Sequence, residues 1–424
     1  MPGPGPIQTD KTNFLDEGFQ PQSMRPRKPS AIPRWVSVVG ARPQFVKLSP
    51  LCRAIQENNV NNPSALIEHQ IIHTGQHYDR EVADVFFDQM EIPAPNFNLG
   101  VGSGSAGTQL ARMLARMEPI LSALHPDWVI VYGDTNSTLA GALLAARLNI
   151  PLAHVEAGCR SGQLSQPEEQ NRLVADQLSQ MLFPASERDA RNLCREGIGT
   201  PKDPFERRSV VVGDILLDAL HQNSAIAERD SEELLRSLGI RSKQYYLLTI
   251  HRAQNTDDPE RLRSICNAAA SLDLPVLFPV HPRTTKILQL QSIPLDGNFI
   301  VLPPQGYLEM IAIENHAKMI FTDSGGVQKE AFYLRVPCIT LREQTEWTET
   351  VDLGANQLAG ADFEKIIAAA RSPRSADWES VNPYGDGSTA KKIVGELAAI
   401  PRRISLRPSE LQLERPIAIA KAAF

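Results

Sequence analysis

A small polar turn in the second half of the chain, within Phe321–Glu330 (Phe-Thr-Asp-Ser-Gly-Gly-Val-Gln-Lys-Glu), could bind an anion. An apolar run before the turn predicts a buried strand, and residues 327–334 predict a helix after it. Ser324, Gly325 and Gly326 lie between them, where a helix N-terminus favours negative charge and glycine lets an anion approach the backbone. The turn therefore indicates a diphosphate site, and it is not a P-loop because no Gly-Lys-Ser/Thr follows. Considered alone, an ordinary strand-to-helix turn with an Asp or Ser cap explains it equally well.

Three carboxylates follow apolar segments in the first half of the chain. Asp134 and Glu156 each come directly after a short apolar run, and Glu168 begins the next helical segment. Because parallel strands end at one edge of a sheet, we expect these three side chains to lie close together. Neighbouring carboxylates raise one another's pKa, which suits general acid–base catalysis. For Asp134 alone, the simpler alternative is a helix cap.

Cationic residues and histidines also follow predicted strands. Arg42 and Lys47 follow the apolar run 35–39, and they suit a phosphate or carboxylate ligand, although two solvated side chains are the simpler reading of this motif alone. His251 and His281 each follow a predicted strand, and an arginine accompanies each of them. One such histidine is usually an ordinary surface group, but two at successive strand ends favour an anion pocket.

Other motifs indicate no further chemistry. The glycine-rich stretch 100–107 has the wrong spacing for a dinucleotide fingerprint, and we expect a loop leading into a helix. His73 and His77 lack a carboxylate or cysteine that would complete a metal site, so no metal is predicted. No hydrolase nucleophile elbow is present.

Composition narrows the class of protein. A chain of 424 residues with 42% hydrophobic and 22% charged residues predicts two or three globular domains. The net charge of −6 argues against nonspecific nucleic-acid binding. The five cysteines are scattered without a CxxC pair, which favours a reducing compartment. Without an apolar run of membrane-spanning length or a signal peptide, we expect a cytoplasmic protein with no membrane partner.

Apolar strands alternate with helical patterns, which predicts an α/β fold. Two such series, separated near residues 213–214, predict two doubly wound Rossmann-like domains that face a cleft. The predicted helices of the first series cover 139–148 and 170–178. The predicted strands are 35–39, 65–72, 128–132, 151–155 and 210–212, then 245–250, 275–280, 299–302, 319–321 and 338–341.

The chain divides into five predicted parts. Residues 1–33 are rich in proline and predict a disordered extension. Residues 34–213 form the N-terminal domain, to which a helix at about 386–400 returns, and 214–385 form the C-terminal domain. Residues 401–424 form a tail.

The motifs, taken in order, resemble those of the non-hydrolysing UDP-N-acetylglucosamine 2-epimerases. No single motif is specific, but this many in one order is a strong signal over about residues 35–360, and neither extension is covered. The matching motifs are Gly40–Lys47, Gly133–Asn136, His154–Arg160, Pro167–Arg172, His251–Asn255, Thr322–Glu330 and Leu341–Glu346.

The resemblance implies a GT-B-like fold with UDP bound to the C-terminal domain in the interdomain cleft. It implies an isomerase that interconverts UDP-GlcNAc and UDP-ManNAc without a cofactor or metal, in polysaccharide biosynthesis, as a homodimer. A base removes the C2 proton while UDP leaves C1, which gives 2-acetamidoglucal, and UDP then adds back. The implied catalytic residues are Asp134, Glu156, Glu168 and His251. The implied substrate-binding residues are Arg42, Lys47, Arg160, His281, Ser324, Gly325, Gly326, Glu330 (for the ribose hydroxyls) and Arg342.

Several positions depart from the family's pattern. Gln44 stands where many members have Glu, Ala253 and Gln254 where many have Arg and Glu, and Trp347 and Thr348 where many have Arg and Pro. Alternatives are therefore a 2-epimerase of a UDP-diacetamido uronic acid, a GT-B glycosyltransferase that uses a UDP-sugar, and a non-catalytic nucleotide-sugar sensor. The three carboxylates favour the epimerase, because neither a transferase nor a sensor requires them.

Overall fold

The computed structural model of the protein describes residues 32–76, 87, 89–295, 297–372 and 377–401. The strands are β1 (Arg34–Val39), β2 (Glu68–His73), β3 (Phe97–Asn98), β4 (Trp128–Tyr132), β5 (Leu152–Val155), β6 (Met181–Phe183), β7 (Arg208–Ser209), β8 (Tyr246–Thr249), β9 (Val276–Pro279), β10 (Phe299–Leu302), β11 (Met319–Thr322), β12 (Cys338–Thr340) and β13 (Asn356–Leu358). The α-helices are α1 (Arg42–Asn61), α3 (Ala106–Leu124), α4 (Asn136–Arg147), α5 (Pro167–Leu178), α6 (Glu187–Arg195), α7 (Ile215–Arg229), α8 (Ser231–Ser237), α9 (Ala253–Thr256), α10 (Pro259–Ala270), α11 (Pro282–Leu290), α12 (Tyr307–His316), α13 (Gly325–Tyr333), α14 (Thr348–Asp352), α15 (Phe363–Arg371) and α16 (Thr389–Ala398).

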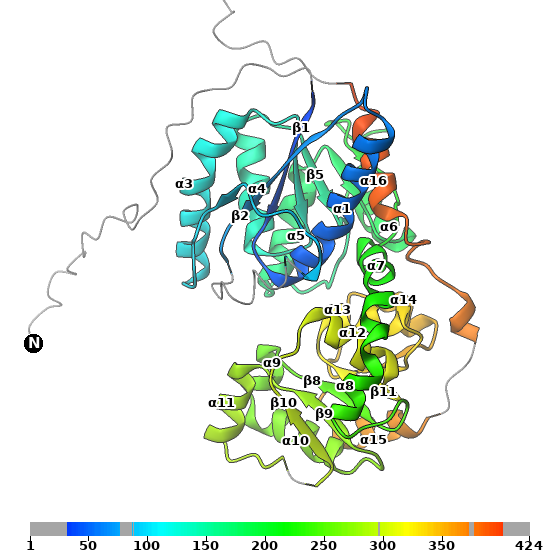
Figure 1. Cartoon of the computed structure of the whole chain (residues 1–424). Coiled ribbons are helices and arrows are strands. Elements are labelled where there is room, and N and C mark those ends of the chain that lie inside the picture. The colour runs from blue at the N-terminus through cyan, green and yellow to red at the C-terminus, as the bar shows by residue number, and fades with distance from the viewer. Residues whose placement is uncertain (1–31, 77–86, 88, 296, 373–376, 402–424) are drawn as a thin grey trace, which may run out of the picture.

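These elements form two α/β domains, one above the other in Figure 1. The first sheet has the strand order β3-β2-β1-β4-β5-β6-β7, and the second has the order β10-β9-β8-β11-β12-β13. The recorded strand pairs are parallel in both sheets. The prediction of an α/β fold with two doubly wound domains is confirmed.

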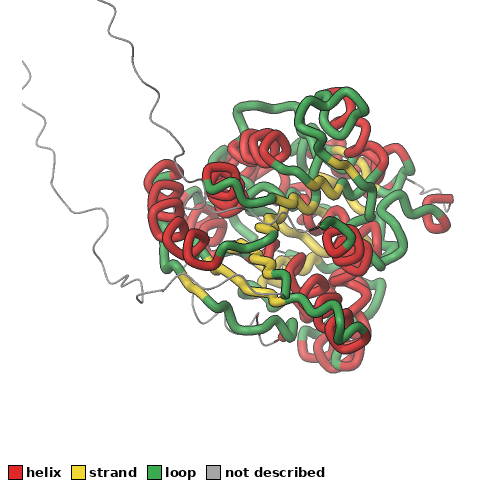
Figure 2. The backbone as a smooth tube through the Cα atoms, turned by 90° about the horizontal axis from the view of Figure 1, so that it is seen from above, coloured by secondary structure: helices red, strands yellow, loops and turns green. Residues whose placement is uncertain are grey.

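The central strands are buried on both faces, because helices cover each side of each sheet. In the first domain α1, α7 and α16 pack on one face, and α3, α4 and α5 pack on the other. In the second domain α10 and α15 cover one face, while α8, α12 and α13 cover the other. Figure 2 shows the helices lying around the strands when the molecule is seen from above.

Two segments connect the domains. Helix α7 begins at the capping residue Asp214 and packs against α1 of the first domain and against α12 and α13 of the second. After α15 the chain returns, and α16 packs against α1 and α7 (Figure 1). Helix α16 therefore lies against the first domain, where we expected the returning helix. The domain boundaries themselves stay predictions.

Some predicted elements differ from the structure. The predicted strand at 210–212 is wrong: β7 ends at Ser209, although the N–H groups of Val210 and Val212 still donate to the carbonyls of Leu182 at 3.0 Å and Pro184 at 3.3 Å before the chain turns to α7. Three short strands, β3, β6 and β13, were not predicted because two or three residues carry little periodicity. Apart from residues 32, 33 and 401, the two predicted extensions lie outside the described residues. No described helix combines the length and the hydropathy needed to cross a membrane.

Candidate active site

The strand order points to one place in each domain where a ligand binds. In doubly wound sheets, ligands lie beyond the carboxyl ends of the strands where the order reverses. The order reverses between β1 and β4 in the first sheet and between β8 and β11 in the second. The segments that follow these four strands begin at Gly40, Gly133, Ile250 and Asp323, and they contain most of the predicted site residues.

The predicted anion turn opens α13. Ser324 is its N-cap residue, and its hydroxyl accepts a hydrogen bond from the N–H of Val327 at 3.4 Å. A side chain at Gly325 would place its Cβ 3.2 Å from Nε1 of Trp347. At Gly326 the nearest atoms would be 3.9 Å away, so its outer side is open. The two glycines therefore leave the helix N-terminus accessible to an anion.

Asp323 joins this turn to the loop after β8. Its buried carboxylate accepts hydrogen bonds from the N–H groups of His251 at 3.1 Å and Arg252 at 3.0 Å. The His251 side chain lies beside the same carboxylate, with Nδ1 3.3 Å from Oδ1, and remains 46% exposed. Desolvation lowers the pKa of His251, Asp323 opposes this, and the nearby cations Arg252 and Arg342 lower it further. The neutral imidazole is thereby favoured.

Four buried charged side chains form a chain of ion pairs across the domain boundary. Nζ of Lys47 lies 2.7 Å from Oε1 of Glu156, and Nζ of Lys329 lies 2.8 Å from Oε2 of that carboxylate. Lys329 also lies 2.7 Å from Oδ2 of Asp214. Lys47 and Glu156 belong to the first domain and Lys329 to α13 of the second, so the chain connects the two carboxyl edges.

The lysines decide the charge of Glu156. Burial alone favours the protonated carboxyl, but Lys329 and Lys47 outweigh it and hold the pKa of Glu156 well below its usual value. The prediction that converging carboxylates raise one another's pKa is therefore wrong for Glu156, because the sequence did not reveal the second lysine. Glu156 also has a φ of 70°, a left-handed conformation that costs a non-glycine residue roughly 1–2 kcal/mol. Such conformations concentrate at functional sites.

Arg172 connects further predicted residues. Its guanidinium pairs with Asp134 and, at 3.1 Å, with Glu169, and it lies 3.9 Å from Glu346 of the second domain. Glu346 accepts hydrogen bonds from both terminal nitrogens of Arg342, at 2.9 and 3.1 Å. The structure thus brings Asp134 and Arg342 into one interdomain network.

Asp134 does not cap the helix that follows it. Thr135 is the N-cap residue of α4, and its hydroxyl accepts from the N–H of Thr138 at 3.4 Å. The helix-cap alternative for Asp134 is therefore wrong, and its carboxylate faces Arg172 instead.

Glu168 is the most accessible of the three carboxylates. It lies in the first turn of α5, which Pro167 begins. Its side chain is 41% exposed, and Oε1 lies 3.9 Å from the guanidinium of Arg252 in the second domain. Glu168 is thus held far less tightly than Glu156.

Glu330 follows Lys329 on α13 and is only 8% exposed. Burial raises the pKa of Glu330 to about 7, Lys329 opposes this, and Asp214 adds to it. Arg42 begins α1, and its guanidinium donates to the carbonyl of Gln305 in the second domain at 3.4 Å. Both residues therefore lie where the two domains meet.

The other two predicted binding residues are His281 in the second domain and Arg160 in the first. His281 lies two residues after the end of β9 and is exposed, and its charge acts on His251. Arg160 pairs with Asp176 and Glu196, each at 2.7 Å. The structure thus pairs Arg160 with two carboxylates of the first domain and not with the interdomain network around Arg172.

His154, in β5, is fully buried. Its ring nitrogens lie 2.7 Å from the Asp176 carboxylate and 2.8 Å from the carbonyl oxygen of Gly133. With both nitrogens bound in this way, the imidazole fixes the backbone at the end of β4.

The family model of UDP-N-acetylglucosamine 2-epimerase matches residues 60–398, which is most of the chain. The chain belongs to the UDP-N-acetylglucosamine 2-epimerase family. The predicted family, and with it the epimerase class of enzyme, is confirmed.

Relatives of the epimerase family match over nearly their whole length. The chain is 47% identical to a UDP-N-acetylglucosamine 2-epimerase homolog of Methanococcus maripaludis, over 85% of this chain and 98% of the relative. It is 40% identical to the UDP-2,3-diacetamido-2,3-dideoxy-D-glucuronate 2-epimerase of Pseudomonas aeruginosa, over 86% and 99%. The crystal structure of Methanocaldococcus jannaschii UDP-GlcNAc 2-epimerase in complex with UDP-GlcNAc and UDP is 41% identical, with a TM-score of 0.76 over 86% of this chain and 99% of that one. The predicted GT-B-like fold agrees with this match.

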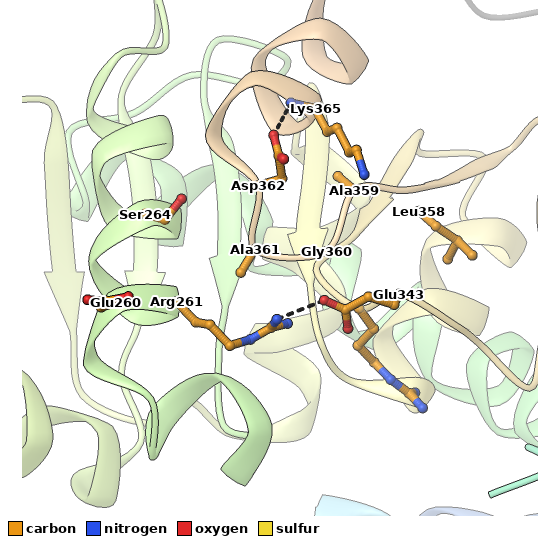
Figure 3. Close-up of a pocket in the computed structure, with 11 residues that line it drawn as sticks. Glu260, Arg261, Ser264, Glu343, Leu358, Ala359, Gly360, Ala361, Asp362 and Lys365 are labelled. Atoms are coloured by element: carbon orange, nitrogen blue, oxygen red, sulfur yellow. Dashed lines mark hydrogen bonds and ion pairs between the residues drawn. The ribbon is translucent and has the colours of Figure 1, made fainter.

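A hollow of about 500 Å³ lies elsewhere in this epimerase-family chain, between α10 and α15 beyond β12 and β13 (Figure 3). Of the predicted site residues, only Arg342 lines it. Arg261 points to Glu343 in Figure 3 and pairs with it at 2.8 Å. Because its lining contains three cations and three carboxylates, the hollow has no excess charge with which to bind an anion.

Sequence reasoning assigned no role to Asp323, Asp214 and Lys329, nor to Arg172 and Glu346 of the interdomain network. Asp323 directly precedes the capping serine, and Asp214 follows the predicted domain boundary. Lys329 stands four residues after Gly325, which on a helix is the same face, and this spacing was the available signal.

Proposed function

We propose that this protein is a UDP-N-acetylglucosamine 2-epimerase that interconverts UDP-GlcNAc and UDP-ManNAc through 2-acetamidoglucal. The observation that carries the proposal is the opposition of two walls at the domain boundary. The second domain contributes the open helix N-terminus at Ser324, and the first contributes the carboxylates Asp134, Glu156 and Glu168. Elimination of UDP needs both an anion-stabilising wall and a base.

The diphosphate would bind at the N-terminus of α13. Gly325 and Gly326 leave room for phosphate oxygens near the backbone N–H groups. Arg42 and Lys47 approach from α1, and His251 from the loop after β8. These groups stabilise the charge that develops on UDP as the C1–O bond breaks.

The C2 proton of the sugar is weakly acidic, so its removal depends on this stabilisation of the leaving group. Glu168 is best suited to exchange a proton, because it is 41% exposed and its cation partner is 3.9 Å away. Glu156 is ionised between two lysines and would supply a fixed negative charge or accept a proton once the substrate loosens those contacts. Return of the proton on the opposite face of C2 requires a second proton donor, and we assign this role to Asp134, which pairs with Arg172.

A 2-epimerase of a UDP-diacetamido uronic acid is the second candidate. The 40% identical Pseudomonas aeruginosa relative, which carries that name, favours it. The chemistry at C1 and C2 would be the same, so the two candidates differ only in how the site accommodates the substituents at C3 and C5.

Proton NMR in D2O with UDP-GlcNAc tests the proposal. A new UDP-ManNAc anomeric signal with deuterium at C2 supports epimerisation by proton abstraction. If UDP binds but neither exchange nor product appears, the same experiment is repeated with the diacetamido uronic acid substrate. Failure of both substrates would overturn the proposed function and favour a glycosyltransferase.

Three finer proposals accompany this function. We expect a homodimer and a role in polysaccharide biosynthesis, as the family resemblance implies, and a cytoplasmic location, as the scattered cysteines indicate. Light scattering of the full chain at several concentrations would test the first of them, and a monomeric mass would refute it.

A further inference from the structure

Lys329 is a charged residue in the centre of the proposed site to which the mechanism above gives no step. Its side chain is 2% exposed, and lysine is almost never this buried without partners. Nζ lies 2.8 Å from Glu156 and 2.7 Å from Asp214. The ring of Trp347 covers the ammonium, with its centroid 4.0 Å from Nζ, which adds a cation–π contact.

The partners of Lys329 come from different parts of the molecule. Glu156 follows β5 of the first domain, and Asp214 caps α7, the helix that packs against both domains. Lys329 itself lies on α13, one turn after Gly325. Because a helical turn rises only about 5.4 Å, the phosphate-binding end of α13 and the ammonium move as one body.

We propose that Lys329 is a positioning residue that places the Glu156 carboxylate relative to the nucleotide on α13, and that it does so only while the two domains are closed. The inference rests on the proposed epimerase function. Separation of the domains would pull Lys329 away from Glu156, because the two residues belong to different domains. The carboxylate would then keep only Lys47 as a close cation. Closure over the nucleotide thus completes the catalytic wall.

The cluster has several charged and titratable neighbours. Asp189 on α6 acts electrostatically on both Lys329 and Glu156, and Arg172 on α5 acts on Glu156. Lys47 and Arg172 remain when Lys329 is removed, so the negative charge of Glu156 would still have two cations nearby. The pKa of Glu156 would rise, because one of its three cations is lost. The titratable and charged groups around the four ion-paired residues Lys47, Glu156, Lys329 and Asp214 are Cys159, Arg172, Asp189, Glu330 and Tyr333.

The test replaces Lys329 by an uncharged side chain of similar length. For Lys329→Met we expect kcat to fall about 10- to 100-fold, since misplacement by about 1 Å costs that much. UDP should bind within about threefold of wild type, because the α13 N-terminus is untouched. The acidic limb of the pH profile of kcat/KM should move to higher pH. Lys318→Met is the matched control, because Lys318 lies in the same domain, is 43% exposed and pairs only loosely with Asp273 at 3.6 Å.

A second variant covers a failure of Lys329→Met to fold. Lys329→Met combined with Asp214→Asn removes one charge of each sign, and asparagine can still cap α7. Low kcat with a shifted pH profile in either variant supports the inference. Wild-type kcat and an unshifted profile would overturn it, and so would equal losses of kcat, UDP affinity and thermal stability without a pH shift. Absence of UDP binding by the wild-type protein would instead overturn the proposed function.

Discussion

Gly325→Ala is the sharpest test of the proposed diphosphate site. Gly325 is the first residue of α13, and a Cβ there would lie 3.2 Å from Nε1 of Trp347. The methyl group would stand beside the helix N-terminus, where the phosphate must approach the backbone. The substitution therefore changes the binding surface while it changes little of the fold.

The effects on folding and on binding can be separated by magnitude. Alanine restricts the unfolded chain and so adds about 0.4–1 kcal/mol of stability where its conformation fits. Contact with Trp347 requires a shift of a few tenths of an ångström, which offsets that gain, so the free energy of unfolding should change by less than about 1 kcal/mol. Loss of one charge-assisted hydrogen bond to phosphate costs about 1.5–3 kcal/mol. UDP affinity should therefore fall by about 10- to 100-fold.

Calorimetric titration with UDP and thermal unfolding of the same samples measure both quantities. Gly395→Ala is the matched control, because Gly395 lies in the exposed face of α16 with no atom within 4 Å of a new Cβ. That variant should gain about 0.5–1 kcal/mol of stability and bind UDP normally. If folded Gly325→Ala bound UDP as tightly as wild type, the nucleotide would have to lie away from α13, and the proposed site would be refuted.

Four further predictions follow from other parts of the chain. Glu156→Gln should reduce kcat by about 100-fold or more in the NMR assay, while the affinity for UDP changes little; full activity would contradict the assigned role of Glu156. Arg160→Ala should lower the free energy of unfolding in urea by about 1.5–3 kcal/mol, because buried Asp176 loses its arginine partner but keeps His154 and the N–H of Gly158; unchanged stability with weaker UDP binding would instead support the original prediction of a substrate contact. Burial, with Glu349 adding to it, raises the pKa of Asp189 to about 7, so the free energy of unfolding falls as pH rises from about 4 to about 7 and the folded protein must ionise this buried carboxyl. Asp189→Asn should therefore flatten the plot of unfolding free energy against pH over that range and stabilise the protein at pH 8 in urea unfolding. An unaltered plot would show that the pKa of Asp189 is not raised. Deletion of residues 1–30 should leave thermal stability and turnover unchanged, and a large fall in the melting temperature would show that this segment contributes to the fold.

The sequence predicted the strands that are buried on both faces. The run Trp128–Tyr132 is β4 without a change of boundary, because a continuous apolar stretch between polar turns has few alternatives. At 210–212 the same reasoning failed, because only Val212 is buried and Val211 is exposed, so this run of valines is not a strand that is covered on both faces. Polar β13 was missed for the opposite reason: Asn356 and Gln357 carry no apolar signal, and pairing with β12 alone makes them a strand.

The candidate site was predictable where it depends on strand ends and not where it depends on packing. Asp134, Glu156 and His251 could be found because the carboxyl ends of parallel strands gather polar residues at one edge. The position of Arg160 in the same kind of motif gave the same expectation, but its side chain turns to Asp176. A motif fixes where the backbone lies, whereas the direction of a long side chain depends on which charges the fold buries beside it.

The departure at Gln44 shows how such local context operates. Its carbonyl oxygen accepts from the N–H of Gly40 at 2.9 Å, and its amide nitrogen donates to the carbonyl of Tyr132 and the hydroxyl of Thr138, each at 3.1 Å. A glutamate could accept from the loop but could not donate to β4. The amide therefore ties the loop after β1 to the end of β4, the two strands between which the order of the sheet reverses. Arg42 follows the end of β1, and Asp134 follows the end of β4. Gln44 therefore fixes the position of Arg42, which we propose binds the diphosphate, relative to the proposed catalytic carboxylate of Asp134, without contacting the substrate itself.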